Sequence, residues 1–476
     1  MSQVSQELNV RTVKYNMSFI WLICLVAAMG GLLFGYDWVV VGGARPFYEP
    51  YFNLNTPSLS GWGASSALIG CLLGAIASGA LSDKFGRKRL LISAGLLFTV
   101  SAIGTGLAGN FFWYNIYRII GGVGIGLASS LSPMYIAEIS PAKLRGRFVS
   151  INQLTIVIGV LAAQLINWLI SLRDTVELPL NPAFEQILAT WNGQYGWRWM
   201  FGAETVPAFA FFVLMFFVPE SPRWLVKNGK AALAEKILAK VGGDEYAKFE
   251  VADIKQTLAG EEIAKVNFRD LLEPKLMKII LIGVILAVYQ QWCGINVIFY
   301  YASDIYKAAG YDISAQMLNI VITGTVMLFF TFIAIGTVDK FGRKILMLLG
   351  SAGLALTYAL IGISFYMKMT GFIVVFLTVI AIAFYSFSLA PIVWVLLSEI
   401  FPNRIRGAAM SIAVFSLWVG CFTLSYSFPS LNKNLGSANT FWLYGLICAA
   451  GFTFVMLVLP ETKGKSLEDL ERELVD

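Results

Sequence analysis

The sequence contains no histidine among its 476 residues, and only 13% of its residues are charged. Histidine is the commonest metal ligand and the side chain that most readily exchanges a proton near neutral pH. Its absence leaves carboxylates to perform any proton chemistry. The shortage of charge, against 57% hydrophobic residues, excludes the mixed composition of an ordinary soluble domain. Most of the chain is therefore expected to lie in lipid.

Cysteine is also scarce, and the five cysteines form no Cys-x-x-Cys pair. All of them fall within apolar stretches: Cys24, Cys71, Cys293, Cys421 and Cys448. We expect them to be reduced packing residues. Neither a nucleotide-binding loop nor a nucleophile constellation stands out, so the sequence predicts no enzyme, bound metal or cofactor.

Long apolar runs dominate the sequence. A helix of about 20 residues crosses the roughly 30 Å hydrocarbon core of a bilayer. We predict twelve spans, near 17–42, 62–82, 90–110, 113–138, 148–172, 197–218, 277–304, 315–338, 345–368, 371–398, 407–430 and 438–459. The 44 glycines, and prolines inside the spans, indicate packed and locally broken helices. The expected fold is an all-α membrane protein with twelve transmembrane helices.

Basic residues gather in alternate connecting segments, which orients the chain with both termini in the cytoplasm. This bias accounts for the net charge of +6 without an acidic partner such as nucleic acid. The polar segment 219–276 is too charged to span a bilayer, and its patterning from Lys230 to Ala264 predicts a helical cytoplasmic linker. It divides an N-terminal half (1–218) from a C-terminal half (277–460), which a tail (461–476) follows.

Three short motifs occur once in each half, as in transporters built by duplication. DKFGRK at 83–88 returns at 339–344, AEISP with a following RG at 137–146 resembles SEIFP with RG at 398–407, and PESPR at 219–223 resembles PETKG at 460–464. We expect the acidic and basic side chains to pair at the cytoplasmic helix ends as a gate. Alternatively, the basic residues only follow the orientation bias. The gate residues are Asp83, Arg87, Glu138, Arg145, Glu220, Arg223, Asp339, Arg343, Glu399 and Arg406.

With GGLLFGYD at 30–37, YRIIGG at 117–122 and QQ, GIN and YY within 290–301, these motifs resemble the sugar porter family of the major facilitator superfamily over 19–468. The resemblance implies two six-helix halves that alternate access around D-xylose or a related pentose or hexose, driven by protons, in a monomer of the cell membrane. The alternatives are a facilitative uniporter, a sugar sensor that does not transport, and an efflux carrier for amphipathic compounds.

Amide side chains cluster in the seventh span. Gln290, Gln291 and Asn296 both donate and accept hydrogen bonds, as sugar hydroxyls require. An unbroken helix would turn Gln291 and Asn296 about 140° apart. We predict that Gly294 breaks the helix and brings these two amides together. Alternatively, the amides hold helices to one another.

Further substrate contacts are implied by the resemblance alone. Gln153 in the fifth span completes the polar set, and Trp394 covers the apolar face of the sugar. By depth, Gln164 is a rival to Gln153. Other pocket positions align with Phe34, Tyr300 and Trp418.

Two positions depart from the sugar porters for xylose and glucose. Met327 and Leu417 stand where those proteins carry amides. The C-terminal side of the pocket is therefore expected to be more apolar, which would favour a sugar with fewer hydroxyls on that side or weaken its affinity.

Three ionisable residues lie at similar depths in the N-terminal half: Asp37, Arg118 and Glu204. Counted from the expected outer ends of their spans, such as Arg45, they lie about 8 to 12 Å below the surface. We predict that Arg118 neutralises one carboxylate and also reaches the second. One carboxyl should then accept a proton, and Asp37 is favoured because it adjoins the glycine-rich first span. Alternatively, the three form a permanently ionised brace at the outer gate.

Overall fold

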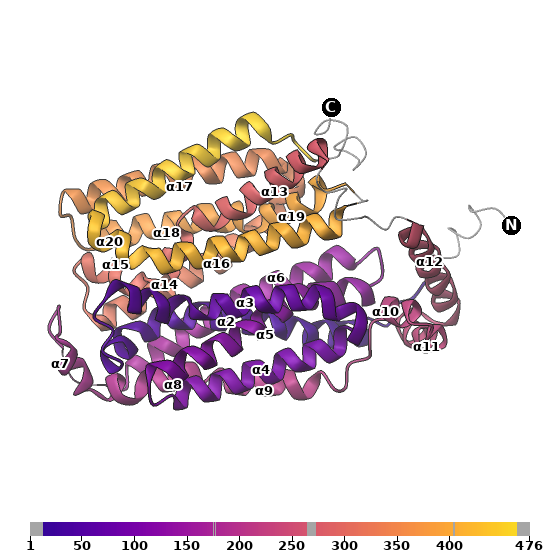
Figure 1. Cartoon of the computed structure of the whole chain (residues 1–476), viewed down its shortest axis with the longest axis horizontal. Coiled ribbons are helices and arrows are strands. Elements are labelled where there is room, and N and C mark those ends of the chain that lie inside the picture. The colour runs from indigo at the N-terminus through magenta and orange to yellow at the C-terminus, as the bar shows by residue number, and fades with distance from the viewer. Residues whose placement is uncertain (1–12, 175, 177, 264–272, 403–404, 464–476) are drawn as a thin grey trace.

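The computed structural model describes residues 13–174, 176, 178–263, 273–402 and 405–463, and within these residues the regular structure is entirely helical. The helices form two bundles (Figure 1), an N-terminal bundle of α2–α9 and a C-terminal bundle of α13–α20. Helices α10–α12, residues 222–263, lie at one end. We call these three helices the connector, the bundle end beside them the connector end, and the opposite end the distal end.

The N-terminal bundle comprises α2 (Met17–Tyr51), α3 (Pro57–Phe85), α4 (Arg87–Leu107), α5 (Phe111–Ile139), α6 (Arg145–Ser171), α7 (Phe184–Leu188), the π-helical turn η1 (Asn192–Gly196), α8 (Trp197–Gly202) and α9 (Thr205–Leu214). The connector comprises α10 (Pro222–Lys227), α11 (Ala231–Gly242) and α12 (Asp244–Ile263). The C-terminal bundle comprises α13 (Pro274–Trp292), α14 (Ile295–Tyr300), α15 (Ala302–Ala308), α16 (Ile313–Phe341), α17 (Arg343–Tyr366), α18 (Phe372–Phe387), α19 (Leu389–Ile400) and α20 (Arg406–Val458).

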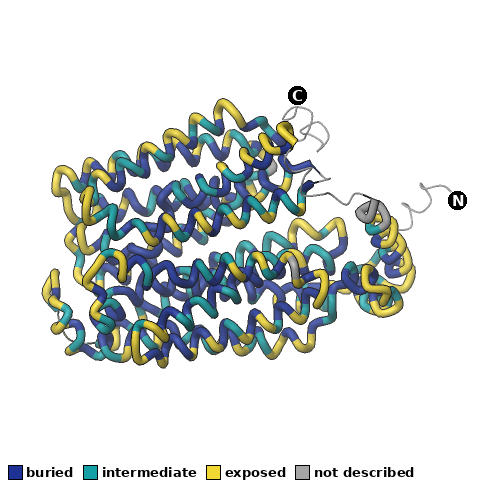
Figure 2. Tube along the Cα trace, viewed as in Figure 1, coloured by how far each residue is buried: buried dark blue, intermediate teal, exposed yellow. Residues whose placement is uncertain are grey.

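Ten helical segments of the described residues are long and apolar enough to cross a membrane. Large apolar side chains are exposed on them, Leu107 by 76% and Phe372 by 73%. Figure 2 shows exposed residues along the outward sides of both bundles and buried ones between helices. In water so much exposed apolar surface would promote aggregation, whereas surrounding lipid accommodates it. All five cysteines are buried and free, as predicted.

Several predicted boundaries need correction. The span 17–42 is too short, because α2 continues through Pro46 and Pro50 to Tyr51. The span 197–218 is divided, because α8 and α9 are separate helices and the second ends at Leu214. The spans 407–430 and 438–459 lie in one element, α20, which is interrupted at Gly436 by a non-helical backbone conformation.

The connector is helical, as the patterning from Lys230 predicted, although residue 264 lies outside the described residues. It also contacts the start of the first long helix. The Asn16 N–H donates to the Val241 carbonyl at 2.8 Å, and the rings of Tyr15 and Tyr246 meet edge to face at 5.6 Å. Helix α2 therefore begins at the connector end and runs toward the distal end.

Candidate functional site

A helix break at Gly294 builds the centre of the candidate site. Helix α13 ends at Trp292, Gly294 has φ +87°, and α14 begins at the next residue. This left-handed conformation favours glycine, and a Cβ there would lie 2.9 Å from the Tyr444 ring. The break returns Asn296 to the side of Gln291, and Asn296 Nδ2 donates to Gln291 Oε1 at 2.6 Å. The predicted meeting of these two amides is confirmed.

The three amides form a buried hydrogen-bonded chain. Gln291 Nε2 donates to Gln290 Oε1 at 3.4 Å, and Gln290 Nε2 donates to the carbonyls of Leu389 and Ala390 at 2.9 and 3.2 Å. Gln290 therefore ties α13 to α19. A sugar hydroxyl that bound Gln291 or Asn296 would replace an amide–amide hydrogen bond of similar strength. The affinity for the sugar would therefore depend on how many of these bonds its hydroxyls replace.

Aromatic side chains from both bundles gather beside the amides. The ring of Phe34 lies 6.1 Å from that of Trp418, and Tyr300 lies 6.3 Å from Trp38. Trp418 Nε1 is buried without a hydrogen-bond partner among the described residues. One helical turn along α20, Cys421 Sγ lies 3.4 Å from Asn296 Nδ2, so an unused indole donor adjoins the amide chain. The structure thus places three of the four expected aromatic residues, Phe34, Tyr300 and Trp418, at the bundle interface.

Two other expected substrate contacts have no described bond to this cluster. Gln153 is half-buried on α6 and Trp394 is 39% exposed on α19, and the described hydrogen bonds and ring contacts link neither to the amides. Met327 and Leu417 are buried. Gln164 is also buried, and its Nε2 reaches Thr323 Oγ1 of the C-terminal bundle at 3.5 Å.

Of the three buried ionisable residues, Arg118 and Asp37 form an ion pair, and Glu204 stays outside it. Arg118 Nη1 donates to the Asp37 carboxylate and Nη2 donates to the Asp37 carbonyl at 3.2 Å. The prediction that Arg118 also bonds Glu204 is wrong in this conformation, because the described ion pairs join Arg118 only to Asp37. Glu204 Oε1 is buried without a described hydrogen-bond partner. The second carboxylate therefore interacts with the pair through space.

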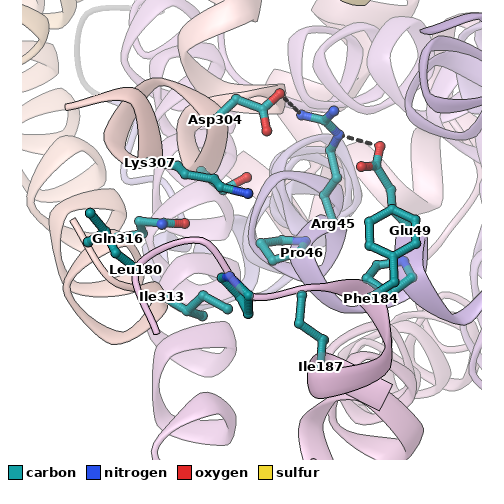
Figure 3. Close-up of a pocket in the computed structure, with 13 residues that line it drawn as sticks. Arg45, Pro46, Glu49, Leu180, Phe184, Ile187, Asp304, Lys307, Ile313 and Gln316 are labelled. Carbon is teal, nitrogen blue, oxygen red and sulfur yellow. Dashed lines mark hydrogen bonds and ion pairs between the residues drawn. The ribbon is translucent and has the colours of Figure 1, made fainter. Parts of the chain in front are cut away.

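A polar cluster at the distal end joins the two bundles (Figure 3). Arg45 is 5% exposed and donates to Glu49 at 2.7 Å, to Ser60 at 2.9 Å and, across the bundles, to Asp304 at 2.5 Å. Its guanidinium also lies 4.3 Å above the Tyr301 ring. A cavity of about 80 Å³ opens beside it, and Figure 3 shows Lys307 and Gln316 on the opposite wall. Arg45 is therefore an interdomain contact rather than the exposed helix end that the sequence suggested.

The repeated motifs converge at the connector end of the N-terminal bundle. Gly86, with φ +88°, ends α3 and starts α4, and the N–H groups of Arg87 and the next residue, which have no partner within the helix, both donate to Glu220 Oε1 at 3.0 Å. The Arg87 side chain donates to Glu138 at 3.0 Å, and Glu138 accepts from Ser221 at 2.5 Å. A carboxylate at a helix N-terminus is favoured by the helix dipole. The three motifs of this half thus form one network.

Asp83 ties the same network to the connector. Lys227 Nζ donates to its carboxylate at 2.8 Å, and Trp224 Nε1 donates to its carbonyl at 2.8 Å. Burial alone raises the pKa of Asp83, but the hydrogen bond and charge of Lys227, together with Arg87, outweigh it and hold the pKa below its ordinary value. Asp83 is therefore a stable anion that holds α10 against α3.

The C-terminal bundle repeats the arrangement. Gly342 has φ +88°, and the N–H of Arg343 donates to Glu461 at 2.9 Å. The Arg343 side chain donates to Glu399 at 3.0 Å, and Thr462 donates to the same carboxylate at 2.6 Å. The duplicated motifs therefore brace each bundle internally.

Four expected gate residues remain: Arg145, Arg223, Asp339 and Arg406. Arg145 is exposed, and Arg406 Nε donates to the Phe401 carbonyl at 3.3 Å instead of to an acid. Arg223 is half-buried in α10, and the side chain of Asp339 lies outside the described part of the chain.

Comparison with known proteins decides the family. Residues 23–474 match the family model described as "Sugar (and other) transporter". The chain belongs to this sugar transporter family. It is 40% identical to the D-xylose-proton symporter of Escherichia coli strain K12 over 96% of each chain, and 39% identical to the arabinose-proton symporter of Bacillus subtilis strain 168 over 97% of this chain and 96% of the relative.

Solved structures of the xylose transporter XylE of E. coli resemble this sugar transporter throughout. The partially occluded inward-open form has a TM-score of 0.82 at 38% identity, covering 94% of this chain and 100% of the other. The form bound to 6-bromo-6-deoxy-D-glucose has a TM-score of 0.79 at 39% identity, covering 97% and 100%. The likeness therefore extends over both bundles of the major facilitator fold.

Sequence reasoning missed the residues of this sugar transporter that close its distal end. Trp38, Arg45 and Asp304 each contact the opposite bundle. A usable signal was present in α2, where Phe34, Trp38, Gly42 and Arg45 recur at helical spacing and define one face. Of their partners, Tyr300 on α14 was expected from the resemblance alone, and Asp304 on α15 has no counterpart signal.

Proposed function

We propose that this chain is a proton-coupled monosaccharide symporter that works by alternating access, with D-xylose and L-arabinose as the first substrates to test. The observation that carries this is the joint presence of a buried amide chain for sugar hydroxyls in the C-terminal bundle and a buried Asp37–Arg118 pair in the N-terminal bundle. The names of the relatives support both substrates, a pentose and a proton.

The described helices support a topology of twelve crossings. We infer twelve membrane crossings, since α20 provides two on either side of Gly436 and α8 with α9 provides one more. The connector end and both termini then face the cytoplasm. The chain accordingly divides into an N-terminal half (1–218), a linker (219–276), a C-terminal half (277–460) and a tail (461–476). We place the protein in the cell membrane as a monomer.

In the sugar site we assign hydroxyl recognition to Gln291 and Asn296, with Trp418 Nε1 as a further donor. Phe34 and Tyr300 supply apolar walls. Gln290 positions the other amides through its bonds to α19. Gln153 and Trp394 complete the site when the bundles close around the sugar at the connector end.

Helix α2 supplies the link between proton and gate. Asp37 faces Arg118 within the N-terminal bundle, while the adjacent Trp38 contacts Phe299 and Tyr300 of the other bundle. Protonation of Asp37 would weaken its bond to Arg118 and allow α2 to shift. Because the same helix carries Trp38 and Arg45, such a shift loosens the distal closure. The connector-end networks keep each bundle rigid, so that the movement becomes a rocking of one bundle against the other.

The test uses Asp37→Asn, with Glu204→Gln as the matched variant. In proteoliposomes we expect Asp37→Asn to lose D-xylose accumulation driven by a pH gradient, and sugar-induced alkalinisation outside, while D-xylose counterflow continues. Asn retains the size of the neutral carboxyl but cannot release a proton. If accumulation fails only in Glu204→Gln, Glu204 rather than Asp37 is the proton carrier. An Asp37→Asn protein that still accumulates sugar and moves protons would exclude Asp37, and a parent protein without proton-driven accumulation would make the chain a uniporter.

A further inference from the structure

A row of polar side chains runs from the distal cavity toward the middle of α16. Gln316 lines the cavity (Figure 3), and Asn319 and Thr323 follow at intervals of three and four residues, before the buried Met327. Residues at this spacing share one face of a helix. Asn319 is 8% exposed, and its Nδ2 has no hydrogen-bond partner among the described residues.

Gln164 meets this row from the other bundle. It is 2% exposed on α6, and its Nε2 lies 3.5 Å from Thr323 Oγ1, at the limit of a hydrogen bond. Its Oε1 has no described partner and fills the space where Gly324 would carry a Cβ. Gln164 thus leaves one acceptor unused at the interface between α6 and α16, and Asn319 leaves one donor unused one turn along α16 from Thr323.

Such amides differ from those that merely hold helices together. Asn167, one turn along α6, also leaves its Oδ1 without a described partner, but its Nδ2 donates to the Val40 carbonyl within its own bundle at 3.0 Å. Gln164 instead crosses between bundles at a poor distance and gains little from closure. Buried unsatisfied groups cost free energy, so a closed state that leaves them unpaired is best explained if another state pairs them.

We propose that Gln164 and Asn319 form a second sugar-hydroxyl site, which binds the sugar when the distal side is open and before it reaches Gln291 and Asn296. This site rests on the proposed function. On opening, α6 and α16 separate and expose a donor and an acceptor on facing walls, which is what a vicinal pair of hydroxyls needs. Closure then removes the sugar from this site and favours its transfer to the central amides.

The experiment compares the apolar variants Gln164→Met and Asn319→Leu, which keep side-chain size, with the control Asn167→Leu. We expect KM for D-xylose uptake from the distal side to rise three- to tenfold in both test variants. D-xylose affinity measured at the connector side in inside-out vesicles should stay within twofold of the parent. Asn167→Leu should lower thermal stability and leave both sugar constants unchanged.

Several results would overturn the site. The first is an unchanged KM for uptake from the distal side in Gln164→Met and Asn319→Leu. The others are an equal loss of affinity on both sides in these variants, or the same rise in KM in Asn167→Leu. Each would show that Gln164 and Asn319 only hold helices together. If the parent transports none of D-xylose, L-arabinose and D-glucose, the proposed function fails, and this site fails with it. Transport by the parent with unaffected variants refutes the second site alone.

Discussion

Removal of the Arg45–Asp304 contact tests what keeps the distal side closed. In Asp304→Asn the ion pair to Arg45 Nη1 is lost, but Arg45 keeps Glu49 and Ser60, so no isolated buried cation results. Because the Asp304 side chain is 40% exposed, solvent screens the pair, and about 1 kcal/mol is the appropriate scale. A change of that size shifts the balance between closed and open distal states about fivefold.

The assay is labelling of Thr323→Cys by a membrane-impermeant maleimide added on the distal side. Thr323 is 1% exposed beneath Gln164, so labelling requires the bundles to part. We expect Asp304→Asn to raise the labelling rate about fivefold at neutral pH, since the rate follows the open population. The five native cysteines are buried, and the parent chain without the added cysteine gives their background.

A matched control is available at the same end. Asp312→Asn also removes one negative charge, but this carboxylate caps α16 by accepting from the Ala315 N–H at 2.8 Å, within one bundle, and asparagine caps as well. Its labelling rate should equal that of the parent. An unchanged rate in Asp304→Asn, or an equal rise in both variants, would show that the interdomain ion pair does not hold the distal closure.

Three other outcomes follow from the central site. Asn296→Ala should weaken D-xylose binding by about 1–3 kcal/mol in equilibrium titration, because it breaks the buried amide chain, and parental affinity would make that amide a helix contact. Gly294→Ala should lower both thermal stability and sugar affinity, whereas Gly243→Ala, with a similar φ but open space around it, should cost only its backbone strain of about 1–2 kcal/mol. Met327→Asn with Leu417→Gln should tighten D-xylose or D-glucose binding in the same titration, and unchanged or weaker binding of both sugars contradicts an apolar pocket wall as the limit on affinity.

Much of this structure could be predicted from local rules applied to the sequence. The meeting of Gln291 with Asn296 depended on helix geometry and one glycine, and the helical connector depended on periodicity. The repeated motifs likewise marked where helix ends meet. These features involve neighbours in the chain or patterns that occur twice.

Local rules could not predict the contacts between the bundles. Arg45 and Asp304 are 259 residues apart, and each occurs in a segment that resembles an ordinary helix end. The preference of Arg118 for Asp37 over Glu204 also depends on how α5 faces α2 and on the turn between α8 and α9. Depth counting placed the three groups together but carried no information on which atoms touch. Pairing of this kind is set by the tertiary arrangement of whole helices.

The two glycine turns that present a helix N-terminus to a glutamate have a consequence for biosynthesis. In the first bundle every partner of this network precedes residue 228, so the bundle can be completed while the second is still being synthesised. The second bundle differs, because Glu461 and Thr462 follow its last helix. Its α17 stays uncapped until the ribosome has passed the final crossing. Deletion of the chain from residue 461 onward should therefore impair maturation of the second bundle and spare the first.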